Sequence, residues 1–476
     1  MTATATPQTG RRRRPTMAIG AFTSLLICMV LWGPPRLRLV DRAANVALEN
    51  PLDLDAAAIF QLAVLGAGCI ATIGCLVRLS DRAAGSLKSL LRGPLGWYAA
   101  LSGFALLSAV YSVQPPYTAY FATKLIVVWA LPALTVARKG LPTAEAILRY
   151  VRVVFTCQAL LVLSLAAILP DVVGQTISGA GYRLTGGTFD DFGYSATIGL
   201  IFAAAGFTVP QRRWRRALLL TLVSLLLVHL VMARTRIMLI GAAAACIVTL
   251  ATRRPRRAAA LAAALAIGGA ALTLTPDSIS GGLQDYARRG QTDSEIGSGS
   301  GRVQAFQFLL DVWKENPIAG SGYAAGTRVN LLRFMTEYGL GIGAGHDVVS
   351  TSLAELGALG LLIVSALYVS VALRVLSIIR ASISTGTNPS PATAAAAGIA
   401  TLTLIHGIAS GGLMHASGPF AISLIALSVN GCRRSTANVN AISAVQGDTP
   451  STGNPRTPTK PAARPQGQLV GQRFQD

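Results

Sequence analysis

The sequence predicts an all-α polytopic membrane protein with about 12 transmembrane helices and a large helical outer loop between spans 9 and 10. Of the 476 residues, 52% are hydrophobic and only 13% are charged, and the mean hydropathy is +0.53. Soluble chains carry about twice that charged fraction. Long apolar runs are separated by short arginine clusters, which is the pattern of membrane spans and their cytoplasmic loops. The composition excludes a soluble enzyme, a disulfide scaffold and a disordered protein.

The apolar runs define the expected spans, because a helix needs about 20 apolar residues to cross the hydrocarbon core. The first run ends in Trp32-Gly33-Pro34-Pro35 without a cleavage pattern, so we expect an uncleaved span there rather than a signal peptide. The expected spans are Met17–Trp32, Ala56–Val77, Pro94–Val113, Tyr117–Ala137, Ile147–Leu169, Phe192–Val209, Ala217–Ala233, Ile237–Thr252, Ala258–Leu274, Val348–Leu376, Ala392–Leu413 and His415–Asn430.

The basic clusters predict the orientation of the chain. The net charge is 41 − 20 = +21, and the clusters fall on one side of the membrane if every run is a full crossing. That side is the cytoplasm by the positive-inside rule, so we expect both termini there and no binding to nucleic acid. The expected parts are a basic cytoplasmic N-terminus at 1–16, spans 1–9 within 17–274, an outer loop at 275–347, spans 10–12 within 348–430 and a disordered cytoplasmic tail at 431–476.

The outer loop at 275–347 contains a predicted amphipathic helix. Ser300 is a suitable N-cap, and Asn316-Pro317 ends the helical pattern. The apolar residues between these limits recur at helical spacing, so we expect the helix to lie on or near the outer membrane face. These residues are Val303, Phe306, Leu309, Leu310 and Trp313.

Four arginines are expected on the outer side. Arg234 and Arg236 occupy a very short turn between two spans, Arg183 lies in the second outer loop, and Arg302 opens the amphipathic helix. A surface position, or snorkelling to lipid headgroups, explains each of them singly. Together they predict a bound phosphate or pyrophosphate, because a guanidinium stays charged and donates two parallel hydrogen bonds. Lys124, near the outer end of the fourth span, either snorkels or contacts the same anion.

His346 is the histidine with a predicted chemical role. It stands where the outer loop returns to the membrane, after the glycine-rich segment Gly343-Ala344-Gly345. An imidazole can accept or donate a proton near neutral pH. His229 and His406 lie within spans, where packing or a contact between helices accounts for them.

Several motifs resemble those of the O-antigen ligase and O-antigen polymerase superfamily. The resemblance covers residues 183–376 in detail and the whole chain in its span count and long outer loop. The matching motifs are Arg183 with Gly187-Thr188-Phe189, Arg234-Thr235-Arg236, Ser300-Gly301-Arg302, Trp313, Asn316-Pro317-Ile318-Ala319-Gly320-Ser321-Gly322-Tyr323, His346 and Leu353-Ala354-Glu355-Leu356-Gly357. One position departs from the family pattern, because Asp347 follows the histidine where relatives usually have asparagine.

The resemblance implies a membrane glycosyltransferase whose donor is a polyprenyl-diphosphate-linked glycan and whose acceptor is another glycan or a glycolipid. An acceptor hydroxyl would attack the anomeric carbon on the outer face of the cytoplasmic membrane, without a metal or other cofactor. In this reading His346 and Arg302 are catalytic. The diphosphate-binding residues would be Arg183, Arg234, Arg236 and Lys124. Whether the enzyme is a polymerase or a ligase stays open.

Three alternatives remain at this point. One is a non-catalytic scaffold in a polysaccharide export complex, which the sequence does not exclude but which would not need the set of arginines. Asp53-Leu54-Asp55, in the first outer loop, resembles the D-x-D of membrane glycosyltransferases that use lipid monophosphate sugars and a divalent metal. The motif is short, and a simple loop end explains it equally well. A polysaccharide transporter would show corresponding broken spans in two halves of the chain, and no internal repeat is evident.

Overall fold

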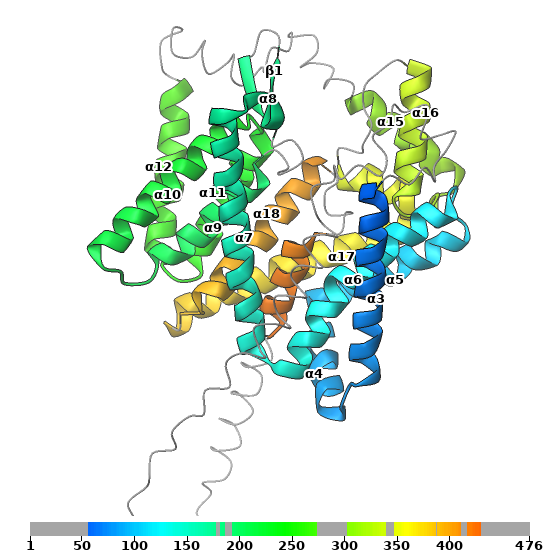
Figure 1. Ribbon diagram of the computed structural model, residues 1–476, viewed down its shortest axis with the longest axis horizontal. Coiled ribbons are helices and arrows are strands. Elements are labelled where there is room, and N and C mark those ends of the chain that lie inside the picture. Colours follow the sequence, from blue (N-terminus) through cyan, green and yellow to red (C-terminus); the bar gives the residue numbers. More distant parts are fainter. Residues whose placement is uncertain are drawn as a thin grey trace, which may run out of the picture. The chain divides into compact units, whose positions relative to one another are not determined.

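The computed structural model describes residues 56–177, 181–185, 193–273, 302–338, 347–386, 388–410 and 417–429, which are almost entirely helical (Figure 1). The expected first span at 17–32 and the tail at 431–476 lie outside the described residues. The helices of the apolar segments are α3 (Ala56–Val77), α4 (Asp81–Leu91), α5 (Pro94–Leu107), the 3-10 helix η1 (Ser108–Val110), α6 (Pro115–Lys139), α7 (Leu141–Ile168), α9 (Tyr194–Phe207), α10 (Arg213–Met232), α11 (Arg236–Ala251), α12 (Pro255–Thr273), α17 (Val348–Thr385) and α18 (Pro391–Ser410).

Six of the described helices are long and apolar enough to cross a membrane, and a seventh span results if the bent pair α4–α5 is taken as one. Three shorter apolar helices accompany them: α9, α11 and the helix Gly418–Val429. These helices make the chain a multi-pass membrane protein. The expected total of about 12 spans stays a prediction, as does the placement of the loops.

The sequence predicts a loop before the third span, and the structure instead has helix α4 there. Ser80 is its N-cap, and its hydroxyl accepts a hydrogen bond from the backbone N–H of Ala83. The axis then turns by 91° into α5 and η1. Pro94 is the first residue of α5, and its ring cannot continue α4 because it lacks a backbone N–H and restricts Gly93 before it.

The segment between α7 and α9, predicted to be the second outer loop, contains a small β-hairpin that the sequence pattern does not predict. Strands β1 (Gly174–Ile177) and β2 (Gly181–Leu184) pair antiparallel, with Gln175 opposite Arg183. The short helix α8 (Pro170–Val173) precedes them. The buried side chain of Leu184 lies in an apolar cluster with Val173 of α8 and Val162 of α7. The hairpin therefore fixes the backbone that carries Arg183.

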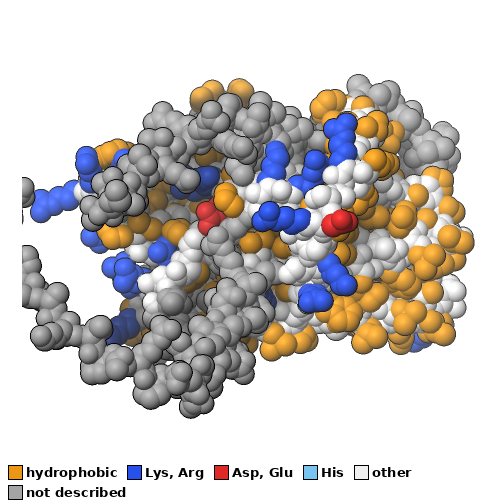
Figure 2. All heavy atoms as spheres, turned by 90° about the horizontal axis from the view of Figure 1, so that it is seen from below, with side chains coloured by type: hydrophobic (Ala, Val, Ile, Leu, Met, Phe, Trp, Pro, Cys, Tyr) orange, Lys and Arg blue, Asp and Glu red, His pale blue; other side chains and the backbone are white. Residues whose placement is uncertain are grey.

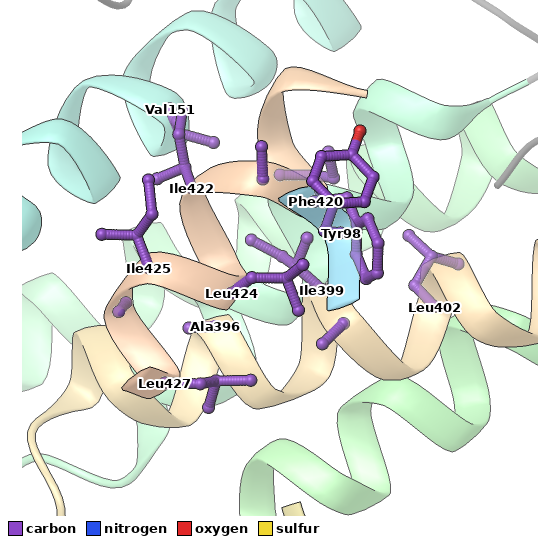
Figure 3. Close-up of a cluster of buried hydrophobic side chains, with 14 of the residues drawn as sticks. Tyr98, Val151, Ala396, Ile399, Leu402, Phe420, Ile422, Leu424, Ile425 and Leu427 are labelled. Carbon is purple, nitrogen blue, oxygen red and sulfur yellow. The ribbon is translucent and has the colours of Figure 1, made fainter. Parts of the chain in front are cut away.

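The core of the bundle combines large apolar residues with close contacts between small ones. Tyr98 of α5 meets Phe420 edge-on, with ring centroids 5.5 Å apart, among side chains of α7 and α18 (Figure 3). A Cβ on Gly398 of α18 would lie only 2.2 Å from the Thr249 hydroxyl of α11. Without a side chain there, the two helices approach closely, which is typical of packing inside a membrane.

Two helices in the segment between α12 and α17 pack on each other and on α17. These are α15 (Arg302–Glu315) and α16 (Ala325–Tyr338), of which only α15 is predicted from the sequence. Of the residues expected on the apolar face, Val303 and Phe306 are exposed, while a face of α15 that includes Leu309 is buried against protein. That face consists of Ala305, Leu309 and Val312, which contact Leu331, Phe334 and Ala354.

Arginines mark several helix ends, as the predicted clusters require. Arg213 begins α10, Arg256 lies in the first turn of α12, and Arg138 lies in the last turn of α6. Figure 2 shows a face on which lysine and arginine side chains, in blue, far outnumber acidic ones and lie between apolar side chains. Such a face is typical of the cytoplasmic side of a membrane protein.

Candidate functional site

The structure describes four of the six predicted site residues with their side chains. Arg183, Arg234, Arg236 and Lys124 are placed, and Arg302 is the first residue of α15, with its side chain outside the description. His346 lies outside the described residues, and so do Asp53 and Asp55 of the D-x-D motif.

Arg183 and Arg234 lie beside each other. The Arg183 Nε donates a hydrogen bond of 3.2 Å to the carbonyl of Ala233, 50 positions along the chain. Ala233 is the C-cap of α10, so the guanidinium satisfies a carbonyl that the helix leaves open. Arg234 follows in the turn to α11 with φ +48, a left-handed conformation that aids the tight reversal. The hairpin and this turn thus bring together two of the predicted cations.

The two guanidinium groups repel each other. Partial burial, together with the positive charge of Arg234, lowers the pKa of Arg183 below its ordinary value. The guanidinium nonetheless stays charged at neutral pH, because arginine ionises far above it. Two like charges held together in a partly desolvated position favour the binding of an anion, which would relieve both the repulsion and the lost hydration.

Arg236 and Lys124 are less closely tied to this pair. Arg236 is exposed at the start of α11, and it makes no hydrogen bond or ion pair with a described residue. Lys124 is half-buried on α6, and its Nζ lies 5.7 Å from the ring centroid of Phe121. A cation over an aromatic face retains part of its stabilisation away from water. The helix that carries Lys124 packs against α3, α5 and α16, whereas the arginine pair belongs to α10, α11 and β2.

A second polar group, missed in the sequence, lies where α6, α16 and α17 meet. Tyr117 of α6 is close enough to Arg328 of α16 and Glu355 of α17 for their charges to act on its hydroxyl. Glu355 is only 3% exposed. An acidic residue within an apolar span is a sequence signal for function, but the neighbours of Glu355 come from distant segments and become visible only in the fold.

The motif residues around Glu355 are joined to a second segment of the chain by backbone hydrogen bonds. Helix α17 is broken at Gly357, which has φ +65. In an unbroken helix the N–H groups of Ala358 and Leu359 would donate to the carbonyls of Ala354 and Glu355. We call residues 354–359 the α17 break, and residues 317–322, which fill it, the insert loop.

The insert loop satisfies all four backbone groups that the α17 break exposes. The N–H groups of Ser321 and Gly322 donate to the two open carbonyls, at 2.9 and 2.8 Å. The carbonyls of Pro317 and Ile318 accept from the two open N–H groups, at 2.9 and 3.2 Å. A broken helix at membrane depth is tolerated when protein groups replace its lost hydrogen bonds, and here a single loop does so.

The opposite side of the insert loop is attached to the start of α6. Val113 donates its N–H to the Ser321 carbonyl at 3.0 Å, and the Tyr111 hydroxyl donates to the Ala319 carbonyl at 2.9 Å. Gly322 is needed at its position because a Cβ there would lie 2.2 Å from the Ser112 hydroxyl oxygen. The insert loop is therefore held on two sides. These contacts fix the position of the end of α15, which precedes the loop, and of the start of α16, which follows it.

Asp347, the residue after His346, is the N-cap of α17. Its Oδ1 accepts the backbone N–H of Ser350 at 2.7 Å, and its Oδ2 is also hydrogen-bonded to the Ser350 hydroxyl. Aspartate and asparagine cap helices about equally well. Asp347 can therefore cap α17 as well as the asparagine that is usual in the similar family, at the position directly after His346.

Comparison with known proteins supports the resemblance seen in the motifs. Residues 221–365 match the family model described as O-Antigen ligase. No curated protein matches the chain. The matched segment contains Arg234, Arg302, the insert loop and the α17 break, whereas Arg183 and Lys124 precede it. The match supports the resemblance of this segment to the O-antigen ligase and polymerase superfamily.

Proposed function

We propose that the protein transfers or polymerises a polyprenyl-diphosphate-linked oligosaccharide on the outer face of the cytoplasmic membrane. The observation that supports this most directly is the pairing of Arg183 with Arg234. The family domain supports glycosyl transfer in a membrane, and the arginine pair supports a donor whose leaving group is a diphosphate.

The chemistry of the reaction explains why such a pair is useful. The oxygen of an acceptor hydroxyl attacks the anomeric carbon of the donor, the bond between that carbon and the diphosphate oxygen breaks, and the hydroxyl loses its proton. Negative charge grows on the departing diphosphate in the transition state. Cations that are already in place stabilise that charge without having to reorganise. Arg183, Arg234 and Arg236 have this role in the proposal, and Lys124 adds a fourth contact.

The two catalytic residues of the proposal belong to the outer loop. His346 takes the proton of the acceptor hydroxyl, since an imidazole is a suitable base near neutral pH. Arg302, at the first turn of α15, binds the diphosphate as the bond breaks. With four arginines and a lysine supplying the positive charge, the proposed reaction proceeds without a metal.

The test is a transfer assay with purified protein in proteoliposomes and a synthetic polyprenyl-diphosphate-linked oligosaccharide. We expect glycan product and released polyprenyl diphosphate from the wild type. His346→Ala and Arg302→Ala should each lower the rate by about 100-fold or more at equal protein levels. Lys314→Ala is the matched control, because Lys314 is on α15, exposed and paired only with Asp311. Normal transfer by both site variants would refute the proposal.

The same assay separates a polymerase from a ligase by its acceptor. A ladder of products from the lipid-linked donor alone indicates a polymerase. Transfer that begins only when a separate glycolipid acceptor is added indicates a ligase. Both outcomes fit the proposed chemistry, because the donor and the leaving group are the same in each.

A further inference from the structure

The charged residue of the α17 break, Glu355, is buried. Its side chain is 3% exposed, and its Oε2 has no hydrogen-bond partner among the described residues. The proposed chemistry does not use it. Burial of a carboxylate costs free energy unless neighbouring groups compensate its charge. Some of the groups around Glu355 must therefore stabilise the carboxylate.

The compensation comes from the N-terminus of α16. The chain at the start of α16 packs closely on Glu355: the Gly322 N–H donates to the Glu355 carbonyl at 2.8 Å, and a Cβ on Gly326 would lie 3.1 Å from the Glu355 Cα. This contact brings the Ala324 N–H and the Thr327 hydroxyl to the Glu355 carboxylate. Helix α16 begins at Ala325, so the carboxylate lies at the positive end of that helix. The first N–H groups of a helix need acceptors, and a negative charge there is favourable. Glu355 thus caps α16 from a different helix.

The backbone at this cap is held in an uncommon conformation. Ala324 has φ +59, a left-handed region that is unfavourable for a residue with a Cβ. Its carbonyl accepts the N–H of Arg328 in the first turn of α16, at 3.1 Å. The Tyr323 carbonyl beside it accepts the Thr118 hydroxyl, at 2.9 Å. Contacts on both sides of the helix start therefore hold Ala324 where its N–H meets the carboxylate.

Helix α16 packs on α15, so the two helices are positioned together. Phe334 and Leu331 of α16 pack on Leu309 of α15, and Ala354, the neighbour of Glu355, completes the same apolar cluster. The cap and the cluster therefore join both outer-loop helices to the α17 break. Displacement of the α16 start would move α15, whose first residue is Arg302.

We propose that Glu355 is a positioning residue, which caps α16 from α17 and so holds the first turn of α15 at the site. This rests on the proposed function, because that function makes Arg302 catalytic. Glu355 itself need not touch the substrate. Its loss should therefore reduce the rate of the chemical step more than the binding of the donor, which the arginine pair performs.

The kinetic test compares Glu355→Gln, Glu355→Leu and the control Glu315→Gln, an exposed glutamate at the end of α15. Leucine cannot accept the Ala324 N–H, and we expect kcat to fall about 100-fold with KM for the donor within twofold. Glutamine keeps an acceptor oxygen but loses the charge, so its kcat should lie between those of leucine and the wild type. A folded leucine variant with normal kcat, or one with only KM changed, would overturn the proposal.

A distance measurement tests the same idea without substrate. Spin labels would be placed at the exposed positions Lys314 of α15 and Leu362 of α17, after replacement of the 6 native cysteines. The distance distribution should be narrow with Glu355 and broader in both variants, more so for leucine. An unchanged distribution in the glutamine and leucine variants would overturn the proposal. If the wild type performs no transfer, the proposed function fails, and the distances still decide whether Glu355 holds α15.

Discussion

The carbonyl oxygen of Ile318 lies 2.3 Å from the place that a Cβ atom on Gly357 would occupy. The insert loop and the α17 break are in direct backbone contact here, and no side chain fits between them. The positive φ of Gly357 adds a second requirement for glycine. Two segments that the sequence presents as separate motifs are therefore one structural unit.

Gly357→Ala should destabilise the protein by about 3 kcal/mol or more, because it adds backbone strain and also expels the Ile318 carbonyl. Gly386→Ala is the matched control, since Gly386 has φ +64 but open space where its Cβ would lie. The control should cost only about 1 kcal/mol. Thermal unfolding of the purified variants in detergent measures both, and equal effects would mean that the close contact is not decisive.

Arg183→Ala and Arg234→Ala should each raise KM for the lipid-linked donor and lower kcat/KM by about 10-fold or more, because each removes a cation from the diphosphate. The double variant should lose less than the product of the two single effects, since the pair shares one ligand. Arg333→Ala, at an exposed position of α16, is the control. Steady-state kinetics at low salt would show this, and strictly multiplicative losses would argue for separate sites.

Asp347→Asn should retain nearly full activity and stability, because asparagine also accepts the Ser350 N–H. Asp347→Ala removes the N-cap and should cost about 1 kcal/mol of stability together with a clear loss of kcat. Ser350→Ala keeps the capped N–H and loses only the hydroxyl bond to Oδ2, so it should cost less stability than Asp347→Ala. A strong loss in the asparagine variant would show instead that the negative charge itself is needed beside His346.

Replacement of Asp53 and Asp55 by asparagine should leave transfer intact, and EDTA should not inhibit it. The reason is that the arginines supply the positive charge in the proposed reaction. Inhibition by EDTA that manganese reverses, or complete loss in the double asparagine variant, would favour the metal-dependent alternative. Lipid-linked monophosphate sugars, offered as donors in the same assay, provide the direct comparison.

The sequence predicts the apolar helices well because their signal is local. Helix α3 has the predicted bounds, Ala56–Val77, since a continuous apolar run ends at Arg78. Helix α15 begins within the predicted segment and stops at Glu315, before Asn316-Pro317. Charge and length fix such elements, and neither depends on what the helix packs against.

The parts that the sequence does not predict depend on tertiary contacts. Helix α16 mixes polar and apolar residues, and its buried face exists only because α15 and the α17 break cover it. Within the candidate site, the motifs place Arg183 and Arg234 on one predicted outer side, but only the β-hairpin shows them adjacent. Glu355 is visible as part of a motif, whereas its capping of α16 requires knowing that Ala324 lies next to it.

The four hydrogen bonds between the insert loop and the α17 break have a consequence for engineering within the family. Residues 317–322 and 354–359 are complementary backbone surfaces, so neither can be grafted alone. A chimera that takes one segment from a homologue should fold only when it takes the other as well. When substrate-contacting loops are exchanged between homologues, the boundaries of the exchange should therefore lie outside these two segments, so that both segments come from the same protein.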